Sequence, residues 1–355
     1  MEHKTTTAQK IYPFEFHGKG GEFFKIWIVN ILLTIITLGI YSAWAKVRTN
    51  RYFYGNTTLN NASFEYLASP LSILKGRIIA VVLFIVYTFI TELNPIAGIV
   101  ILVLFMLATP YIVVRAIRFQ HRMTAYRNVR FDFTAGFGEA AMAYIVWPLL
   151  SMFTLGLLYP FVHQRFTQLY VSNSCYGEAT FVSQASVGAF YKLYLILFTL
   201  IISFYAVILI AAMTMGIGLS DISALNIETP GIASSIILMF IAGISILFYF
   251  FAIAFIKARF TNLIVNNTVL DERCHFESTL SVSAILWLLS SNAVLIICTL
   301  GLAYPWTKVR LARYRAEHSQ MMSHTSLDDF IGQRVGKTNS LSEEMGEIFD
   351  IDIGL

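Results

Sequence analysis

The sequence predicts a mainly α-helical, polytopic membrane protein. Composition is the first reason, because 57% of its 355 residues are hydrophobic and only 13% are charged. Soluble domains carry about 25% charged residues, so a soluble protein with a large core is strongly disfavoured. The second reason is a set of apolar runs that reach or approach the roughly 20 residues needed to cross a bilayer. The third is a motif that recurs three times, which indicates duplicated units.

The repeated motif joins an apolar run to Thr-Leu-Gly, then to an aromatic residue, a basic residue and an arginine. Its copies begin at Thr37, Thr154 and Thr299. The motif glycines are Gly39, Gly156 and Gly301. Glycine and the nearby Pro160 and Pro305 both weaken a helix, so we predict a structural break at these three glycines. Asn30 and Asn292, at matching offsets, could then satisfy backbone groups near the breaks.

The duplication extends beyond the motif. A shift of 117 residues places Thr37 on Thr154, Phe64 on Phe181 and Lys75 on Lys192. Each repeat unit therefore contains a Gly-broken membrane segment and a helical-hairpin pair. The predicted divisions are an N-terminal cytoplasmic segment (1–21), a first repeat unit (22–130), a second repeat unit (131–282), a partial third repeat (283–318) and a polar, acidic cytoplasmic tail (319–355).

Basic residues suggest how the apolar segments cross the membrane. The segments are 22–45, 77–93, 96–115, 139–162, 193–217, 232–256 and 283–306. Loops 46–77 and 115–130 each carry five Lys or Arg, whereas 94–95 and 218–231 carry none. Cytoplasmic loops carry the excess of cations, so only the last two loops should be external and both termini should be cytoplasmic.

Two topologies remain open. In the first, the three motif segments enter the bilayer, break at the glycine and return to the same side, so that the other four segments cross fully. In the second, each of the seven segments is an ordinary span. The first topology satisfies every basic loop, whereas the second fits the length of segment 22–45.

Short basic helices should follow the membrane segments. A basic residue precedes an asparagine by ten residues at Lys46, Arg118, His163 and Lys257, and the pattern begins again at Lys308. Stretches that alternate apolar and polar residues come next, and they include Phe14, Phe64, Phe131, Phe181 and Phe276. Such alternation is typical of strands, so we expect short β pairings on the cytoplasmic face.

The candidate binding residues are the cations beside the membrane. They could bind anionic lipid headgroups or a soluble anion, or they could simply determine topology. The set is Lys46, Arg48, Arg51, Arg118, Arg122, His163, Arg165, Lys257, Arg259, Lys308, Arg310 and Arg313. No catalytic constellation, metal-ligand pattern or cofactor motif is found, and nothing indicates a nucleic-acid partner. Membrane lipids are the partners that the sequence suggests.

Three stretches (14–24, 37–48 and 51–57) resemble a bacterial inner-membrane family of unknown function called DUF898, the YjgN-like proteins. The resemblance covers essentially the whole chain. It implies a multi-pass protein of the cytoplasmic membrane and brings no catalytic residues. We expect a non-enzymatic protein that is transporter-like or binds a small or amphipathic molecule. The alternative is a structural protein that binds lipids or organises the membrane through its basic cytoplasmic face.

Overall fold

One closed β-barrel of ten short strands holds the chain together. The computed structural model describes residues 10–214, 232–323 and 327. All neighbouring strands are antiparallel, and β1 pairs with β10, so the first and last strands complete the barrel. The strands are β1 (Lys10–Phe16), β2 (Thr57–Leu59), β3 (Ala62–Tyr66), β4 (Thr124–Tyr126), β5 (Val129–Phe133), β6 (Ser174–Tyr176), β7 (Ala179–Ser183), β8 (Thr268–Leu270), β9 (Cys274–Ser278) and β10 (Ser319–Ser323).

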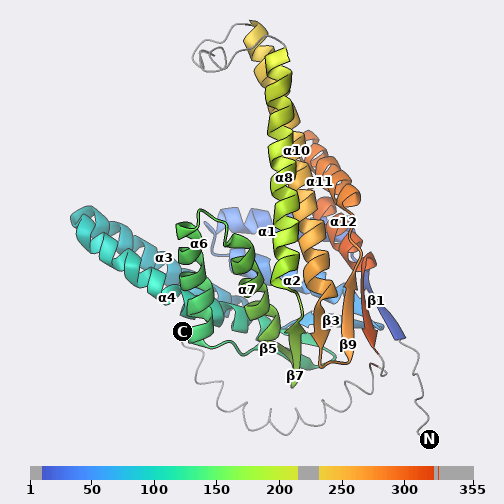
Figure 1. The fold of residues 1–355 in the computed structure, drawn as a ribbon. Helices are drawn as coiled ribbons and strands as arrows, with labels where there is room; N and C mark the ends of the chain where they lie inside the picture. Colours follow the sequence, from blue (N-terminus) through green and yellow to red (C-terminus); the bar gives the residue numbers. More distant parts are fainter. Residues whose placement is uncertain (1–9, 215–231, 324–326, 328–355) are drawn as a thin grey trace, which may run out of the picture.

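Helical hairpins rise from one side of this barrel (Figure 1). Each hairpin unit is a strand, a first helix, a reversal, a second helix and a second strand. The strands of one unit pair with each other, so both ends of every helical hairpin lie at the barrel. Hairpin units 1 to 5 are residues 10–59, 62–126, 129–176, 179–270 and 274–323.

Units 2 and 4 are long, and units 1, 3 and 5 are short. The long units contain α3 (Pro70–Leu93), α4 (Pro95–Arg122), α8 (Val187–Thr214) and α10 (Ile232–Asn266). The short units contain α1 (Gly20–Ile36), α2 (Ser42–Gly55), α5 (Phe137–Ala141), η1 (Met142–Val146), α6 (Trp147–Phe153), α7 (Tyr159–Ser172), α11 (Val282–Cys298) and α12 (Tyr304–Glu317). Among the described residues, four helices are long and apolar enough to cross a membrane, and all four belong to the long units.

The Thr-Leu-Gly motif is the reversal of each short hairpin, so the predicted structural breaks are confirmed. Gly39, Gly156 and Gly301 have φ of 93°, 85° and 92°, and the leucine before each also has positive φ. Each glycine N–H donates to the carbonyl five residues earlier at 2.8 Å, the bond that closes a Schellman motif. The threonine hydroxyls accept from the backbone N–H four residues later, at 2.9, 3.2 and 2.9 Å, and so start the second helix.

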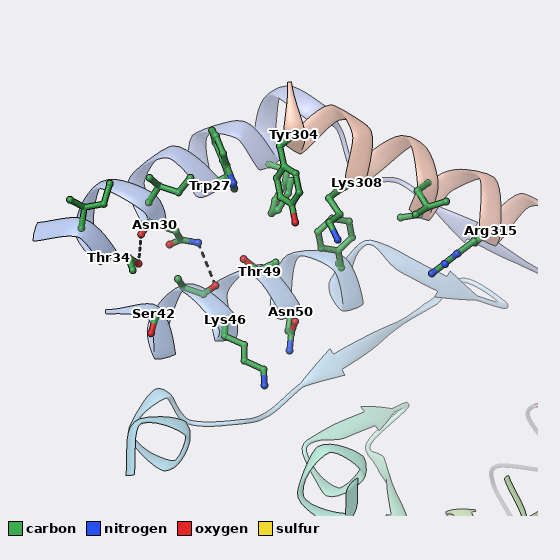
Figure 2. Close-up of a pocket in the computed structure, with 17 residues that line it drawn as sticks. Trp27, Asn30, Thr34, Ser42, Lys46, Thr49, Asn50, Tyr304, Lys308 and Arg315 are labelled. Atoms are coloured by element: carbon green, nitrogen blue, oxygen red, sulfur yellow. Dashed lines mark hydrogen bonds between the residues drawn. The ribbon is translucent and has the colours of Figure 1, made fainter. Parts of the chain in front are cut away.

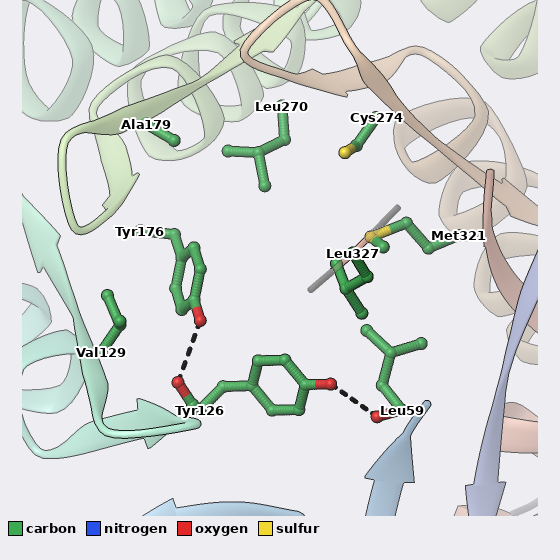
Figure 3. Close-up of a cluster of buried hydrophobic side chains, with 9 residues drawn as sticks. All are labelled: Leu59, Tyr126, Val129, Tyr176, Ala179, Leu270, Cys274, Met321 and Leu327. Atoms are coloured by element: carbon green, nitrogen blue, oxygen red, sulfur yellow. Dashed lines mark hydrogen bonds between the residues drawn. The ribbon is translucent and has the colours of Figure 1, made fainter. Parts of the chain in front are cut away.

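The barrel interior is filled by side chains from every unit. A phenylalanine occupies the same strand position in each unit and packs against the central cluster: Phe14, Phe64, Phe131, Phe181 and Phe276. Figure 3 shows Leu327 among the other interior side chains, and its N–H donates to the Tyr12 hydroxyl at 3.2 Å. The short strands that the alternation predicted are thus joined into one continuous barrel.

Three sequence-based predictions need correction. The structure has five hairpin units, because 22–130 and 131–282 each contain two hairpins and the third repeat is completed by β9 and β10. The tail cannot begin at 319, since Met321 and Ser323 alternate into the barrel interior and are buried. Asn128 is not equivalent to Asn56, because it lies in the turn between β4 and β5 at a φ of 64°. The expected external loop 218–231 lies outside the described residues.

The reversals give a direct stability test. An added Cβ would meet nothing within 4 Å at Gly39 or Gly301, so alanine there costs only the strain of a left-handed backbone, roughly 1–2 kcal/mol. We therefore expect Gly39→Ala and Gly301→Ala to lower the melting temperature of purified protein in detergent. Gly76→Ala, in regular helix with open space around it, should leave the melting temperature unchanged or raise it. Equal behaviour of all three variants would contradict this account of the motif.

Candidate functional site

The candidate cations occupy repeated positions on the second helices of the units. Four lie nine residues before the end of their helix: Lys46, His163, Lys257 and Lys308. Four lie seven residues before it: Arg48, Arg165, Arg259 and Arg310. Three lie four residues before it: Arg51, Arg118 and Arg313. The last, Arg122, is the final residue of α4 and forms an ion pair with Asp132 at 2.9 Å.

The arginines four residues before the helix ends link neighbouring units. Arg118 donates to the carbonyls of Phe133 (2.7 Å) and Ala135 (3.2 Å), which lie where unit 3 passes from strand to helix. Arg51 donates to the carbonyl of Tyr66 in unit 2 at 3.3 Å. Arg313 donates to the carbonyl of Gly18 in unit 1 at 3.0 Å. The ring of links is completed by Gln164, which donates to Ala185, and Asn262, which donates to Leu280. These guanidinium groups therefore hold the units together.

His163 differs from the other candidates. Its Nδ1 is hydrogen-bonded to the Tyr194 hydroxyl at 2.9 Å, and its ring packs against Phe190 and Phe260. Burial lowers the pKa of His163 below its ordinary value of 6.5, because a low-dielectric environment disfavours the charged imidazole. The surroundings of His163 therefore disfavour the charged form that the sequence prediction assumed.

Lys46 and Lys308 both line a groove between units 5 and 1 (Figure 2). The groove has a volume of about 820 Å³ and is lined by α1, α2 and α12. Arg315, from α12, is a third cation in the lining. Among the described residues, none of those lining the groove is acidic. Its walls also include Trp27, Tyr304 and other large apolar side chains.

Asn30 supplies a buried polar group in the same lining. Only 5% of this residue is exposed. Its Nδ2 donates weakly to the Ala45 carbonyl at 3.4 Å, as the sequence suggested, but its Oδ1 has no hydrogen-bond partner among the described residues. The matching Asn292 accepts from Arg310 at 2.9 Å instead. A buried amide oxygen without a partner costs free energy, so Asn30 differs from Asn292 in leaving its oxygen unsatisfied.

The arginines seven residues before the helix ends lie on another face. Each of these arginines lies two positions after the basic residue nine before the helix end. Two positions correspond to a rotation of about 200° around a helix. Arg310 accordingly lines a second, almost wholly apolar groove beside Phe24 and Trp306, which does not contain Lys308. Unit 2 places a further arginine, Arg115, at this position. We call Arg48, Arg115, Arg165, Arg259 and Arg310 the outer arginine ring.

Two members of these surfaces, Arg115 and Arg315, were missed from the sequence. Arg115 was not among the candidates because the ten-residue pattern matched Arg118 with Lys257. In the structure Val113 is the equivalent of Lys257, and Arg115 is therefore the equivalent of Arg48. Counting back from the end of each second helix recovers it. Arg315 has no counterpart in the repeated motif, and its place in the groove depends on the packing of unit 5 beside unit 1.

Cations beside aromatic and aliphatic walls match a ligand with an anionic group and an apolar body. Within the described ranges, no group of three or more His, Cys, Asp or Glu could hold a metal ion.

Fold and site together define a helical membrane protein whose hairpins stand on a ten-stranded barrel. The chain belongs to the DUF898 family, described as bacterial proteins of unknown function, and the family model matches residues 11–348. It is 28% identical over 348 residues to the inner membrane protein YjgN of Salmonella typhimurium, covering 86% of this chain and 87% of that protein. It is 24% identical to the Escherichia coli K12 protein of the same name, covering 90% of each. No solved structure matches the chain. These relatives support placement in a bacterial inner membrane.

The linking arginines predict a loss of stability on truncation. Arg118→Ala would leave two carbonyls at the unit boundary without their charged donor, at a cost of about 2 kcal/mol. We expect a clearly lower melting temperature in detergent. Arg130→Ala, which removes an exposed cation from β5, should change the melting temperature little. The linking role would be contradicted if the two variants melted alike.

Proposed function

We propose that this protein is a multi-pass inner-membrane protein that binds an anionic amphipathic molecule in the groove between units 5 and 1. The barrel and both chain ends would lie on the cytoplasmic side, as the basic loops predict. No covalent step is part of the proposal. Its main support is the groove itself, which is lined by Lys46, Lys308 and Arg315 and, within the described part of the chain, by no acidic residue.

Electrostatics favours an anion at this place. Like charges repel more strongly beside low-dielectric walls than in water, and the lining provides no carboxylate to balance the three cations. A phosphate or carboxylate group would relieve this repulsion. The ligand would lay its apolar part against Trp27 and Tyr304.

A structural role is the second candidate. The barrel interior favours it, because aromatic side chains from all five units pack against the central cluster there. Transport would require a path from the groove to the far side of the long hairpins. Residues 215–231 lie outside the described ranges. A ligand held in this groove is expected for binding or transport, whereas the structural alternative requires lipid contacts only at the basic cytoplasmic face.

Lipid retention tests the proposal. Wild-type protein purified in mild detergent should retain an anionic amphiphile that native mass spectrometry detects, with phosphatidylglycerol as the probe when lipid is added back. The triple variant Lys46→Gln, Lys308→Gln and Arg315→Gln should lower the occupancy at least tenfold, because it removes all three cations of the groove.

The matched control removes three exposed cations of the barrel, Lys10→Gln, Arg130→Gln and Arg273→Gln, so that net charge falls equally. This control should retain the ligand. Equal retention by both triple variants, or no bound anion in the wild type after lipid is added back, would overturn ligand binding in the groove.

A further inference from the structure

We infer that the outer arginine ring binds the phosphate headgroups of anionic lipids and sets how deeply the protein sits in the bilayer. We rest this inference on the membrane placement proposed above, and not on ligand binding in the groove. The ring lies on the opposite face of the second helices from Lys46 and Lys308, so the two surfaces can be tested separately.

Recurrence is the first observation. An arginine stands seven residues before the end of the second helix in all five units, although the units differ in length and in most neighbouring residues. At the position two residues earlier, Val113 replaces the basic residue in unit 2. A requirement specific to arginine, repeated around the molecule at one level, fits the bidentate recognition of phosphate.

Aromatic neighbours are the second observation. Arg48 donates to the Tyr41 hydroxyl at 2.9 Å, and Arg115 donates to the Tyr111 hydroxyl at 3.0 Å. The Arg165 guanidinium lies 4.8 Å from the centre of the Phe161 ring. Tyrosine is enriched at the level of lipid headgroups, and these contacts hold the guanidinium groups at a fixed height beside the helix.

Helix length is the third observation. In α4, the residues from Pro95 to Val114 carry no charge, and Arg115 is the first charged residue met from the far end. Twenty residues of helix span about 30 Å, which equals the thickness of the hydrocarbon core. If Arg115 lies at the near headgroups, Pro95 therefore lies at the far ones.

The short hairpins reach far less deeply from the same level. The second helix begins six residues before the arginine in units 1, 3 and 5, which is about 9 Å. Their tips end in Leu38, Leu155 and Leu300, which are 94–95% exposed in the isolated chain. Such apolar tips belong in hydrocarbon, so the three hairpins end in the near half of the bilayer.

Depth measurements test the placement. In cysteine-free protein, a fluorescent thiol probe at Leu155→Cys should show the same quenching profile with depth-specific brominated lipids as one at Leu107→Cys, eight residues or about 12 Å beyond Arg115. In whole cells, an impermeant thiol reagent should label Asn94→Cys and leave Leu155→Cys unlabelled. Labelling of Leu155→Cys from outside, or quenching of its probe by an aqueous quencher, would overturn the inferred depth.

Lipid selectivity tests the arginines themselves. Spin-labelled phosphatidylglycerol should lose at least half of its preference over phosphatidylcholine in the variant Arg48→Gln, Arg115→Gln and Arg259→Gln, which removes the three exposed members of the ring. The barrel variant Lys10→Gln, Arg130→Gln and Arg273→Gln is the matched control and should keep the preference. If the groove variant lost the preference and the ring variant kept it, the ring inference would fail while the proposed function stood.

Discussion

Closure of the barrel by β1 and β10 is the constraint on which the rest of the structure depends. The register that pairs Tyr12 with Met321 brings the two ends of the described chain together. Once the barrel is closed, the helices of every unit must leave it and return to it. A hairpin whose second helix has 14 residues, about 21 Å, cannot cross a bilayer and return. The chain must therefore reverse after a short helix, and the Thr-Leu-Gly motif forms this reversal.

The unit boundaries explain why so many arginines lie near the barrel without forming one binding site. Arg51, Arg118 and Arg313 join neighbouring units through backbone carbonyls. Three residues earlier in each of these helices stands a member of the outer arginine ring. One helix thus serves three purposes on three faces: it links units, contacts the surroundings and lines the groove. Charge counts alone cannot separate these purposes, because all three use the same residue types.

The sequence predicts the local structure better than the assembly. The glycine breaks, the four long apolar helices and the strand-like stretches could all be predicted, because each depends on a few adjacent residues. The closed barrel could not, since pairing of β1 with β10 joins residues about 300 apart that share no repeat signal. The groove was missed for the same reason: Lys308 lines it together with Lys46 only because unit 5 packs beside unit 1.

A disulfide between β1 and β10 tests the closure most directly. Ile11 and Met322 are register partners with side chains on the outer face of the barrel, and such partners lie close enough to be bridged. In cysteine-free protein oxidised in native membranes, Ile11→Cys with Met322→Cys should form an intramolecular disulfide, whereas Ile11→Cys with Arg130→Cys should not. Absence of the first crosslink, or its formation only between molecules, would contradict a barrel closed by the two ends of the chain.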